Sequence, residues 1–239
     1  MGGSIQIGTS GWNYPHWKGP FYPEKSRPQD FLKFYCENFS TVEINNTFYH
    51  LPTKKAVQEW YRTTPKHFIF AVKGSRFITH MKKLKVTKRS ISIFFRRIDN
   101  LKEKLGPILF QLPPRWNANP ERLKTFLRNL PKGYSYAFEF RSPAWFSEEI
   151  YETLEKHKAS FCIYDLAGTL SPVKTTSDIV YIRLHGPGGA YQGDYSRTML
   201  NKWRDSITSW KDEGKSVYCY FDNDICGYAP KNAKELVGL

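Results

Sequence analysis

Eight short apolar runs recur along this sequence, and six of them have, at or next to their ends, residues that can transfer protons or bind anions. The ionisable residues at or just after these ends are Glu43, Lys73, Glu139, Arg141, Asp165, Arg183, His185 and Asp222. Carboxylates and imidazole are general acids and bases, whereas Lys and Arg bind phosphate and carboxylate groups. The pattern predicts an acid/base site in a cationic pocket. Glu139 and His185 are its candidate acid and base, and Arg141 and Arg183 are its candidate anion clamp.

The spacing of these residues predicts that they share a face. Alternate residues of a strand point the same way, and Glu139 is two residues from Arg141, as Arg183 is from His185. The apolar residues between them, such as Phe138, fall on the other face. We therefore expect the charged set to point inward, although Glu139 and Arg141 could also form a purely structural ion pair.

The elements that would position this set recur along the whole chain of 239 residues. The eight expected strands are residues 5–8, 41–44, 68–73, 107–111, 136–140, 160–165, 179–185 and 217–222. Amphipathic patterns predict helices at 28–37, 54–64, 90–104, 120–130, 146–157, 198–213 and 230–237. This alternation predicts an α/β fold, a (β/α)₈ TIM barrel formed by one domain over 1–239, with chemistry at the carboxyl ends of the strands. The gap at 166–178 is too short for much helix, so one helix is expected to be reduced to a turn.

Basic residues are unevenly spread in a chain whose net charge is +14. Residues 73–104 contain eleven basic and two acidic residues, which is +9 of that total. A basic face attracts phosphate-rich partners through counterion release. The candidate nucleic-acid-binding residues are Lys82, Lys83, Lys85, Lys88 and Arg89. The alternative is a solvated exterior that serves solubility.

Other features limit the class of protein. No apolar run approaches the roughly 18 residues of a membrane-spanning helix, and residues 1–5 lack the pattern of a signal peptide. The four cysteines are scattered without a CxxC pair, which is typical of a reduced cytoplasmic protein. We therefore expect a cytoplasmic protein with no membrane partner.

Several motifs resemble the YecE-like family, also called DUF72. They are GTSGWNY at 8–14, VEINNTFY at 42–49, QLPP at 111–114, EFR at 139–141, RLHG at 183–186 and YFDND at 220–224. The resemblance extends in order along nearly the whole chain. It implies a TIM barrel, in agreement with the strand count, for a family whose activity is not settled. The family commonly has a histidine after the EFR step, where this chain has Ser142, so no role is assigned to a histidine there.

Together these observations favour an enzyme that acts by acid/base chemistry on a phosphate-bearing substrate, a nucleotide or a nucleic acid, with a hydrolase-like activity. The candidate substrate-binding residues are Trp12, Glu43, Asn45, Tyr49, Lys73, Arg76, His80, Gln111, Arg141, Asp165, Arg183, Asp222 and Asn223. One alternative is a non-catalytic nucleic-acid-binding barrel that uses the basic surface.

Another alternative is a metal-dependent hydrolase or isomerase, but no clustered metal-ligand motif is present and the interspersed cations disfavour it. No cofactor is expected, and the oligomeric state is left open.

Overall fold

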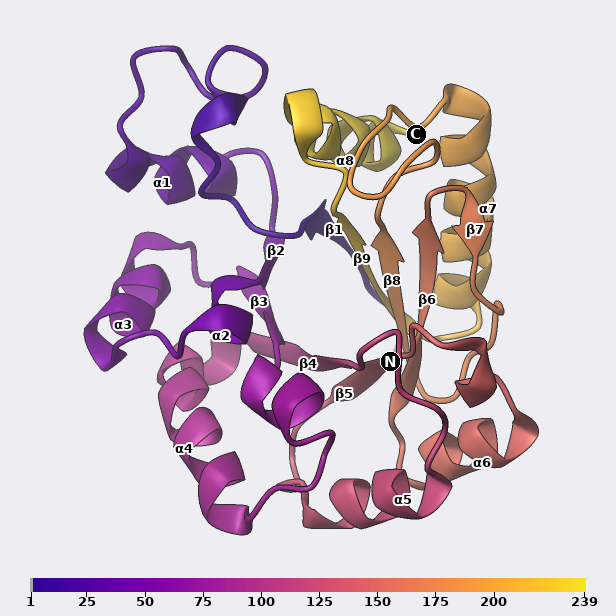
Figure 1. Cartoon of the computed structure of the whole chain (residues 1–239). Helices are drawn as coiled ribbons and strands as arrows, with labels where there is room; N and C mark the ends of the chain where they lie inside the picture. The colour runs from indigo at the N-terminus through magenta and orange to yellow at the C-terminus, as the bar shows by residue number, and fades with distance from the viewer. Residues whose placement is uncertain (1) are drawn as a thin grey trace.

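The parallel strands of this protein curl into a nearly closed barrel with helices outside, as Figure 1 shows for the computed structural model, which describes residues 2–239. The order around the sheet is β1-β9-β8-β6-β5-β4-β3-β2, and all neighbouring pairs on this path are parallel. The bounds of the strands are β1 Ile5–Thr9, β2 Thr41–Ile44, β3 Ile69–Lys73, β4 Leu105–Gln111, β5 Tyr136–Glu139, β6 Ser160–Leu166, β8 Ile179–Leu184 and β9 Ser216–Phe221. The predicted (β/α)₈ architecture is confirmed.

Helices follow most strands and cover the outside of the sheet (Figure 1). The α-helices are α1 Phe31–Cys36, α2 Asn46–Tyr49, α3 Lys54–Thr63, α4 Lys88–Ile98, α5 Pro120–Asn129, α6 Glu148–Lys156, α7 Arg197–Asp212 and α8 Tyr228–Gly238. Shorter helical turns are η1 Pro15–Trp17, η2 Pro28–Asp30, η3 Phe77–Met81, η4 Asp99–Lys104, η5 Pro143–Trp145 and η6 Ile225–Gly227. In the described chain, no helix combines the length and the apolar character needed to cross a membrane.

Two helix starts follow the local sequence rules. Thr53 caps α3 by accepting a hydrogen bond from the Ala56 N–H at 3.1 Å, and Asn119 caps α5 by accepting from the Arg122 N–H at 2.9 Å. Each cap satisfies a backbone donor that has no partner within its helix, as expected for these residue types.

The segment predicted as one helix over 90–104 is instead two pieces. α4 begins at Lys88, because the Thr87 side chain accepts from the Ser90 N–H at 3.2 Å, and it ends at Ile98. A short 3₁₀ segment follows, in which Lys102 has a φ of 52°. Such a left-handed residue cannot continue a right-handed helix. Leu105, predicted to pack from the helix, is the first residue of β4.

The predicted loss of a helix after the sixth strand is confirmed. A two-residue turn joins β6 to the short antiparallel strand β7, Thr169–Leu170. Both turn residues are left-handed, with φ values of 53° at Ala167 and 74° at Gly168. Two-residue hairpin turns prefer positive φ values at both turn residues. Because residues 167–170 form this hairpin, too few residues remain before β8 for a helix.

The two faces of the strands pack differently. Inside the barrel, one buried cluster is formed by Ala71, Leu109, Ala137, Cys162, Tyr181 and Tyr220. Alternate residues such as Phe70, Phe110 and Phe138 belong to a separate cluster that includes buried residues of the helices. The period-two alternation therefore separates the interior of the barrel from its helix-covered outside.

The weakest join of the barrel lies between β1 and β2, which form only an isolated bridge between Ser10 and Glu43. The Tyr35 hydroxyl fills the gap lower down, since it accepts from the Thr9 N–H at 2.9 Å and donates to the Thr41 carbonyl at 3.0 Å. The Tyr35 hydroxyl thus bridges backbone groups of β1 and β2 that do not hydrogen-bond to each other directly. Gly8 is needed here, because a Cβ would lie 2.3 Å from the Thr41 carbonyl oxygen.

Candidate active site

A single buried guanidinium holds together the carboxyl ends of the strands. Arg183 at the end of β8 is 0% exposed. Its Nη2 donates to Glu43 Oε1 at 2.7 Å and to Asp222 Oδ2 at 3.1 Å. Its Nη1 donates to Glu139 Oε2 at 2.8 Å. Three carboxylates from β2, β5 and the end of β9 therefore converge on one cation.

His185 closes this network on one side. Its Nδ1 lies 2.9 Å from Asp222 Oδ2, and its Nε2 lies 2.9 Å from Arg141 Nη2 and 3.3 Å from Arg183 Nη1. Guanidinium nitrogens can only donate, so these two contacts suit Nε2 as an acceptor with the ring proton on Nδ1, facing Asp222. The same Nε2 lies 3.4 Å from Glu139 Oε1, a contact that suits a proton on Nε2 instead. Both ring nitrogens are therefore occupied by protein groups.

The charges of the network stabilise one another. Burial alone would raise the pKa of Glu139, but Arg141 and Arg183 hold it well below its usual value. Asp222 behaves in the same way, because Arg183 and His185 lower its pKa against the effect of burial. Burial opposes the charge of Arg183, and the pKa of that guanidinium is nevertheless raised by Glu43, Glu139 and Asp222. The carboxylates accordingly stay charged and turned toward the arginines.

The convergence predicted from strand phase is found, but the accessibility expected of an anion clamp is not. Arg183, Glu139 and His185 are each 0% exposed. Every N–H of Arg183 faces a protein acceptor, because Nε also donates to Glu43 Oε1 at 3.2 Å. In this structure Arg183 organises the carboxylates, and the prediction that it binds an anion stays a prediction.

Lys73, at the end of β3, is a basic residue near this network that forms no ion pair with its carboxylates. Its Nζ lies 4.7 Å from the centroid of the Phe48 ring, and the residue is half-buried. Within residues 2–239, no ion pair reaches it, since the nearby carboxylates pair with arginines and His185. Burial, followed by repulsion from Arg183, lowers the pKa of Lys73 to about 8, although Glu139, Asp222 and Glu43 oppose this shift.

Two further basic residues follow Lys73 on the β3–α4 connection. His80 is half-buried, its ring lies edge-on to Phe48 at 5.0 Å, and its Nδ1 contacts Thr79 Oγ1 at 2.9 Å. Burial lowers the pKa of His80, and so do Lys73, Arg76 and Arg141. Arg76 is exposed and forms no ion pair within the described chain. Positive charge therefore gathers at the open side of the buried network.

Arg141 links the buried network to this cationic side. It donates from Nε to Glu139, its guanidinium lies 5.1 Å over the Tyr164 ring, and its side chain is 7% exposed. The predicted pairing with Glu139 is therefore present. Because Arg141 also affects the pKa of His80, it lies between the carboxylates and the open cations.

Three other predicted residues lie at strand ends without joining the ion pairs. Gln111 ends β4 in register with Glu139 and is half-buried. Asp165 keeps its Oδ1 buried without a hydrogen-bond partner, and burial raises the pKa of its carboxyl group. Asn45 precedes α2, and its Oδ1 is likewise buried and unpartnered. These residues form the wall of the mouth, outside the Arg183 network.

Two further predicted contacts of the substrate, Trp12 and Tyr49, line a hollow of about 570 Å³ together with Asn45, whereas Asn223 does not line it. Trp12 packs edge-on against Trp60 with ring centroids 5.4 Å apart. Tyr49 is 63% exposed on α2. Asn223 is buried, and its Nδ2 donates to the Gly193 carbonyl at 2.8 Å and to Asn232 Oδ1 at 2.9 Å. Asn223 thus holds the loop after β8 in place through its Nδ2, while its Oδ1 has no partner among the described residues, and its role in substrate binding stays a prediction.

Two residues of the network were missing from the predicted site. Tyr181 donates from its hydroxyl to Glu43 Oε2 at 2.7 Å, and the Ser10 hydroxyl donates to Glu43 Oε1. Tyr181 lies two residues before Arg183, so strand phase was the available signal. Ser10 directly follows β1, where a strand-end position was the corresponding signal.

The basic surface candidates continue from the mouth. Lys82, Lys85, Lys88 and Arg89 are exposed, whereas Lys83 is half-buried. They lie on the loop after η3 and on the first turn of α4. No ion pair involving these five residues forms within the part of the chain that the structure describes. They therefore extend the positive charge outward from Arg76 and His80.

The donor set does not suit a metal ion. Among residues 2–239, no group of three or more His, Cys, Asp and Glu side chains is arranged to hold one. Glu43, Glu139 and Asp222 converge, but on the Arg183 guanidinium, which occupies the place that a cation would take. The metal-dependent alternative thus finds no support in these contacts.

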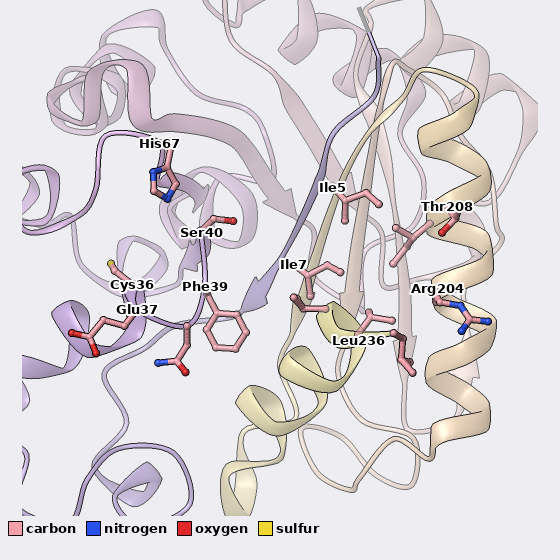
Figure 2. Close-up of a pocket in the computed structure, with 14 residues that line it drawn as sticks. Ile5, Ile7, Cys36, Glu37, Phe39, Ser40, His67, Arg204, Thr208 and Leu236 are labelled. Carbon is pink, nitrogen blue, oxygen red and sulfur yellow. The ribbon is translucent and has the colours of Figure 1, made fainter.

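A separate hollow lies at the opposite end of the strands. It has a volume of about 580 Å³, and Figure 2 shows Ile5 and Ile7 of β1, Phe39 and His67 near the starts of β2 and β3, and Arg204 of α7 around it. Chemistry in such barrels takes place at the carboxyl ends of the strands. The ionic network is at that end, so we place the candidate site there and not in this hollow.

Sequence and structure comparisons find the same family. The family described as "Protein of unknown function DUF72" matches residues 6–239. The UPF0759 protein YunF of Bacillus subtilis is 27% identical over 98% of this chain and 94% of its own length. A DUF72 protein of Thermotoga maritima is 31% identical, with a TM-score of 0.89 over 98% of both chains. A DUF72 protein of Enterococcus faecalis, 20% identical, has a TM-score of 0.80 over 99% of this chain and 98% of its own.

Proposed function

This chain belongs to the DUF72 family of proteins of unknown function, and from the chemistry of its barrel mouth we propose that it is an enzyme acting on a phosphate-bearing substrate by acid/base chemistry. The observation that carries the proposal is the set of unpaired basic residues, Lys73, Arg76 and His80, beside a network whose carboxylates are already paired. Bringing like charges together costs free energy, and a bound anion that neutralises them would offset this cost. A nucleotide or nucleic acid is the substrate class that we favour.

The proposed roles follow from accessibility. Lys73, Arg76 and Arg141 bind the anion, and Lys73 and His80, whose pKa values are both lowered, transfer protons at the open surface. Glu139 and His185 were the candidate acid and base. We propose that Glu139 and His185 instead hold the Arg141 guanidinium in place, and that Glu139 favours its charged form. The reaction would be hydrolase-like, without a resident cofactor, and the cytoplasmic location stays a prediction from the scattered cysteines.

Removing the guanidinium of Arg76 is expected to weaken binding of pyrophosphate about tenfold, because the anion then has one charge-assisted hydrogen-bond donor fewer. The measurement is isothermal titration of pyrophosphate into wild-type protein and Arg76→Ser. Arg62→Ser is the matched control, since Arg62 is 64% exposed on α3 and pairs with Glu59 at 3.5 Å. Equal affinity of wild type and Arg76→Ser, or equal weakening in both variants, would contradict an anion site at the mouth.

The basic surface supports a second candidate function, nucleic-acid binding without catalysis. Reversing the charge of Lys82, Lys85 and Lys88 together is expected to lower the dependence of log affinity on log salt by roughly 0.7–0.9 for each phosphate that is no longer neutralised. Fluorescence anisotropy with single-stranded and duplex DNA measures this slope. The matched control reverses three exposed lysines elsewhere, Lys25, Lys132 and Lys156.

The outcomes separate the two candidates. Binding that depends on the surface lysines alone, and is unchanged in Arg76→Ser and Lys73→Met, favours the non-catalytic barrel. Binding that depends on neither set argues against nucleic acid as a partner.

A further inference from the structure

We propose that the amine of Lys73 is a carbonyl-reactive nucleophile that forms an imine with an aldehyde or ketone carrying a phosphate or carboxylate group. The inference rests on the proposed anion site, because the charged group of the substrate would bind the cations around Lys73. It deepens that function by naming a covalent step and the class of molecule that undergoes it.

The isolation of Lys73 is the first argument. Glu43, Glu139 and Asp222 all turn toward Arg183, with contacts of 2.7 to 3.1 Å. The Lys73 amine makes no hydrogen bond or ion pair within residues 2–239, and its near neighbour is the apolar Phe48 ring. An ammonium group without a partner in a half-buried position is poorly solvated. The face of the Phe48 ring offers the ammonium a cation–π contact, which replaces only part of the lost hydration. Burial therefore still favours the neutral amine, which is the nucleophilic form.

The charges around Lys73 act in the same direction. Arg183 repels its proton from within the barrel, and this repulsion adds to the effect of burial. Glu139, Asp222 and Glu43 act oppositely but do not outweigh burial and Arg183, so the pKa of Lys73 is about 8. Near pH 7.5 roughly a quarter of such amines are neutral, against about 0.1% of ordinary lysines with a pKa near 10.4.

The proposed step is balanced without an oxidant or a reductant. The neutral amine nitrogen of Lys73 attacks the carbonyl carbon, a C–N bond forms, and the carbonyl electron pair moves to oxygen. After proton transfer from nitrogen to oxygen and protonation of the resulting hydroxyl, water leaves and the nitrogen lone pair forms the C=N bond. The net change converts the ammonium and the carbonyl into a protonated imine and one water molecule.

His80 is placed to assist the loss of water. Its ring shares the Phe48 contact with Lys73, and its lowered pKa favours the neutral ring at neutral pH. Thr79 contacts Nδ1, which leaves Nε2 free of a described protein contact. A neutral imidazole at this position can accept the proton released by the amine and return it to the departing hydroxyl.

Pyridoxal 5′-phosphate is the probe, because it is an aldehyde that also carries a phosphate. Wild-type protein is incubated with it, reduced with borohydride, digested and analysed by peptide mass spectrometry. We expect the reduced adduct at Lys73, and we expect labelling to increase as the pH rises through about 8. 5′-Deoxypyridoxal, which lacks the phosphate and has no hydroxyl that could close on the aldehyde, is expected to label Lys73 roughly tenfold less at equal concentration, because it cannot accept the charge-assisted hydrogen bonds of the cations.

Two variants test the assignment. Lys73→Arg keeps a cation but removes the amine, and we expect it to lose the specific adduct. Lys18→Arg is the matched control, since Lys18 is an exposed lysine whose Nζ lies 6.0 Å from the Phe31 ring centroid, and we expect its labelling to equal that of wild type. Circular dichroism checks that both variants fold. The mapping of the wild-type adduct does not depend on either variant.

The possible outcomes test the imine at Lys73 separately from the proposed anion site. Label spread over surface lysines, or unchanged in Lys73→Arg, overturns the nucleophile. If pyridoxal 5′-phosphate competes with pyrophosphate but leaves no adduct at Lys73, the anion site stands and the imine is wrong. If 5′-deoxypyridoxal labels Lys73 as well as pyridoxal 5′-phosphate does, the amine is reactive and the anion site is wrong.

Discussion

Arg183→Met is expected to lower the free energy of unfolding by about 3–5 kcal/mol, the usual loss when one partner of a buried ionic network is removed. The variant leaves Glu43, Glu139 and Asp222 buried beside one another without their shared counterion. Methionine restores much of the volume of the side chain, so the loss reports on charge and hydrogen bonding. Urea unfolding monitored by fluorescence measures it, and the slope of the transition should stay unchanged.

The pH dependence separates this effect from poor packing. The pKa values of Glu139 and Asp222 are depressed in the folded protein, so their stabilisation is present above the unfolded values near 4 and is lost as the pH falls through the folded values. The deficit of Arg183→Met relative to wild type should therefore shrink under acidic conditions. Arg62→Met, at an exposed pair, is the control and should change stability by less than about 1 kcal/mol. A deficit of that small size in Arg183→Met would contradict the network.

Tyr35→Phe is expected to lower the free energy of unfolding by about 2–4 kcal/mol, because two buried backbone groups lose their partner at about 1–3 kcal/mol each. The hydroxyl accepts from the Thr9 N–H at 2.9 Å and donates to the Thr41 carbonyl at 3.0 Å, where β1 and β2 lack a regular ladder. The ring itself stays in place, so the apolar packing is retained. Urea unfolding measures the loss, and hydrogen exchange of the Thr9 amide locates it.

The matched control is Tyr134→Phe. Its hydroxyl donates to Asp99 Oδ1 at 2.8 Å at an exposed position, where water can replace the missing bond. We expect a change below about 1 kcal/mol there. If Tyr35→Phe behaves like this control, and the Thr9 amide exchanges no faster, the barrel does not depend on the hydroxyl at this join.

Much of the barrel could be read from local patterns. Period-two alternation along the strands predicted that Glu139, Arg183 and Asp222 would face one space, because the direction of a side chain in a strand is set by its position. Helix caps such as Thr53 and Asn119 also follow from local sequence, since a cap side chain accepts a hydrogen bond from a backbone N–H only three residues away.

Other features had no local signal. The α-helix expected over 90–104 ends at Ile98, and the 3₁₀ segment that follows is interrupted by the positive φ of Lys102, which the identity of the residue does not indicate. The open join between β1 and β2 depends on how the last strands close the ring, so it could be seen only after the chain had folded. Asn223 was predicted to contact the substrate because it follows a strand, but its Nδ2 donates a hydrogen bond to the Gly193 carbonyl in the loop after β8.

The sequence by itself therefore determined which residues meet, since strand phase and strand order are properties of the chain. Which of them stay available for chemistry was decided by the tertiary structure. Arg183 is neutralised by carboxylates that come from β2, β5 and the end of β9, whereas Lys73 is left without one. The physical reason is that pairing and desolvation depend on neighbours that are distant in sequence and come together only when the barrel closes.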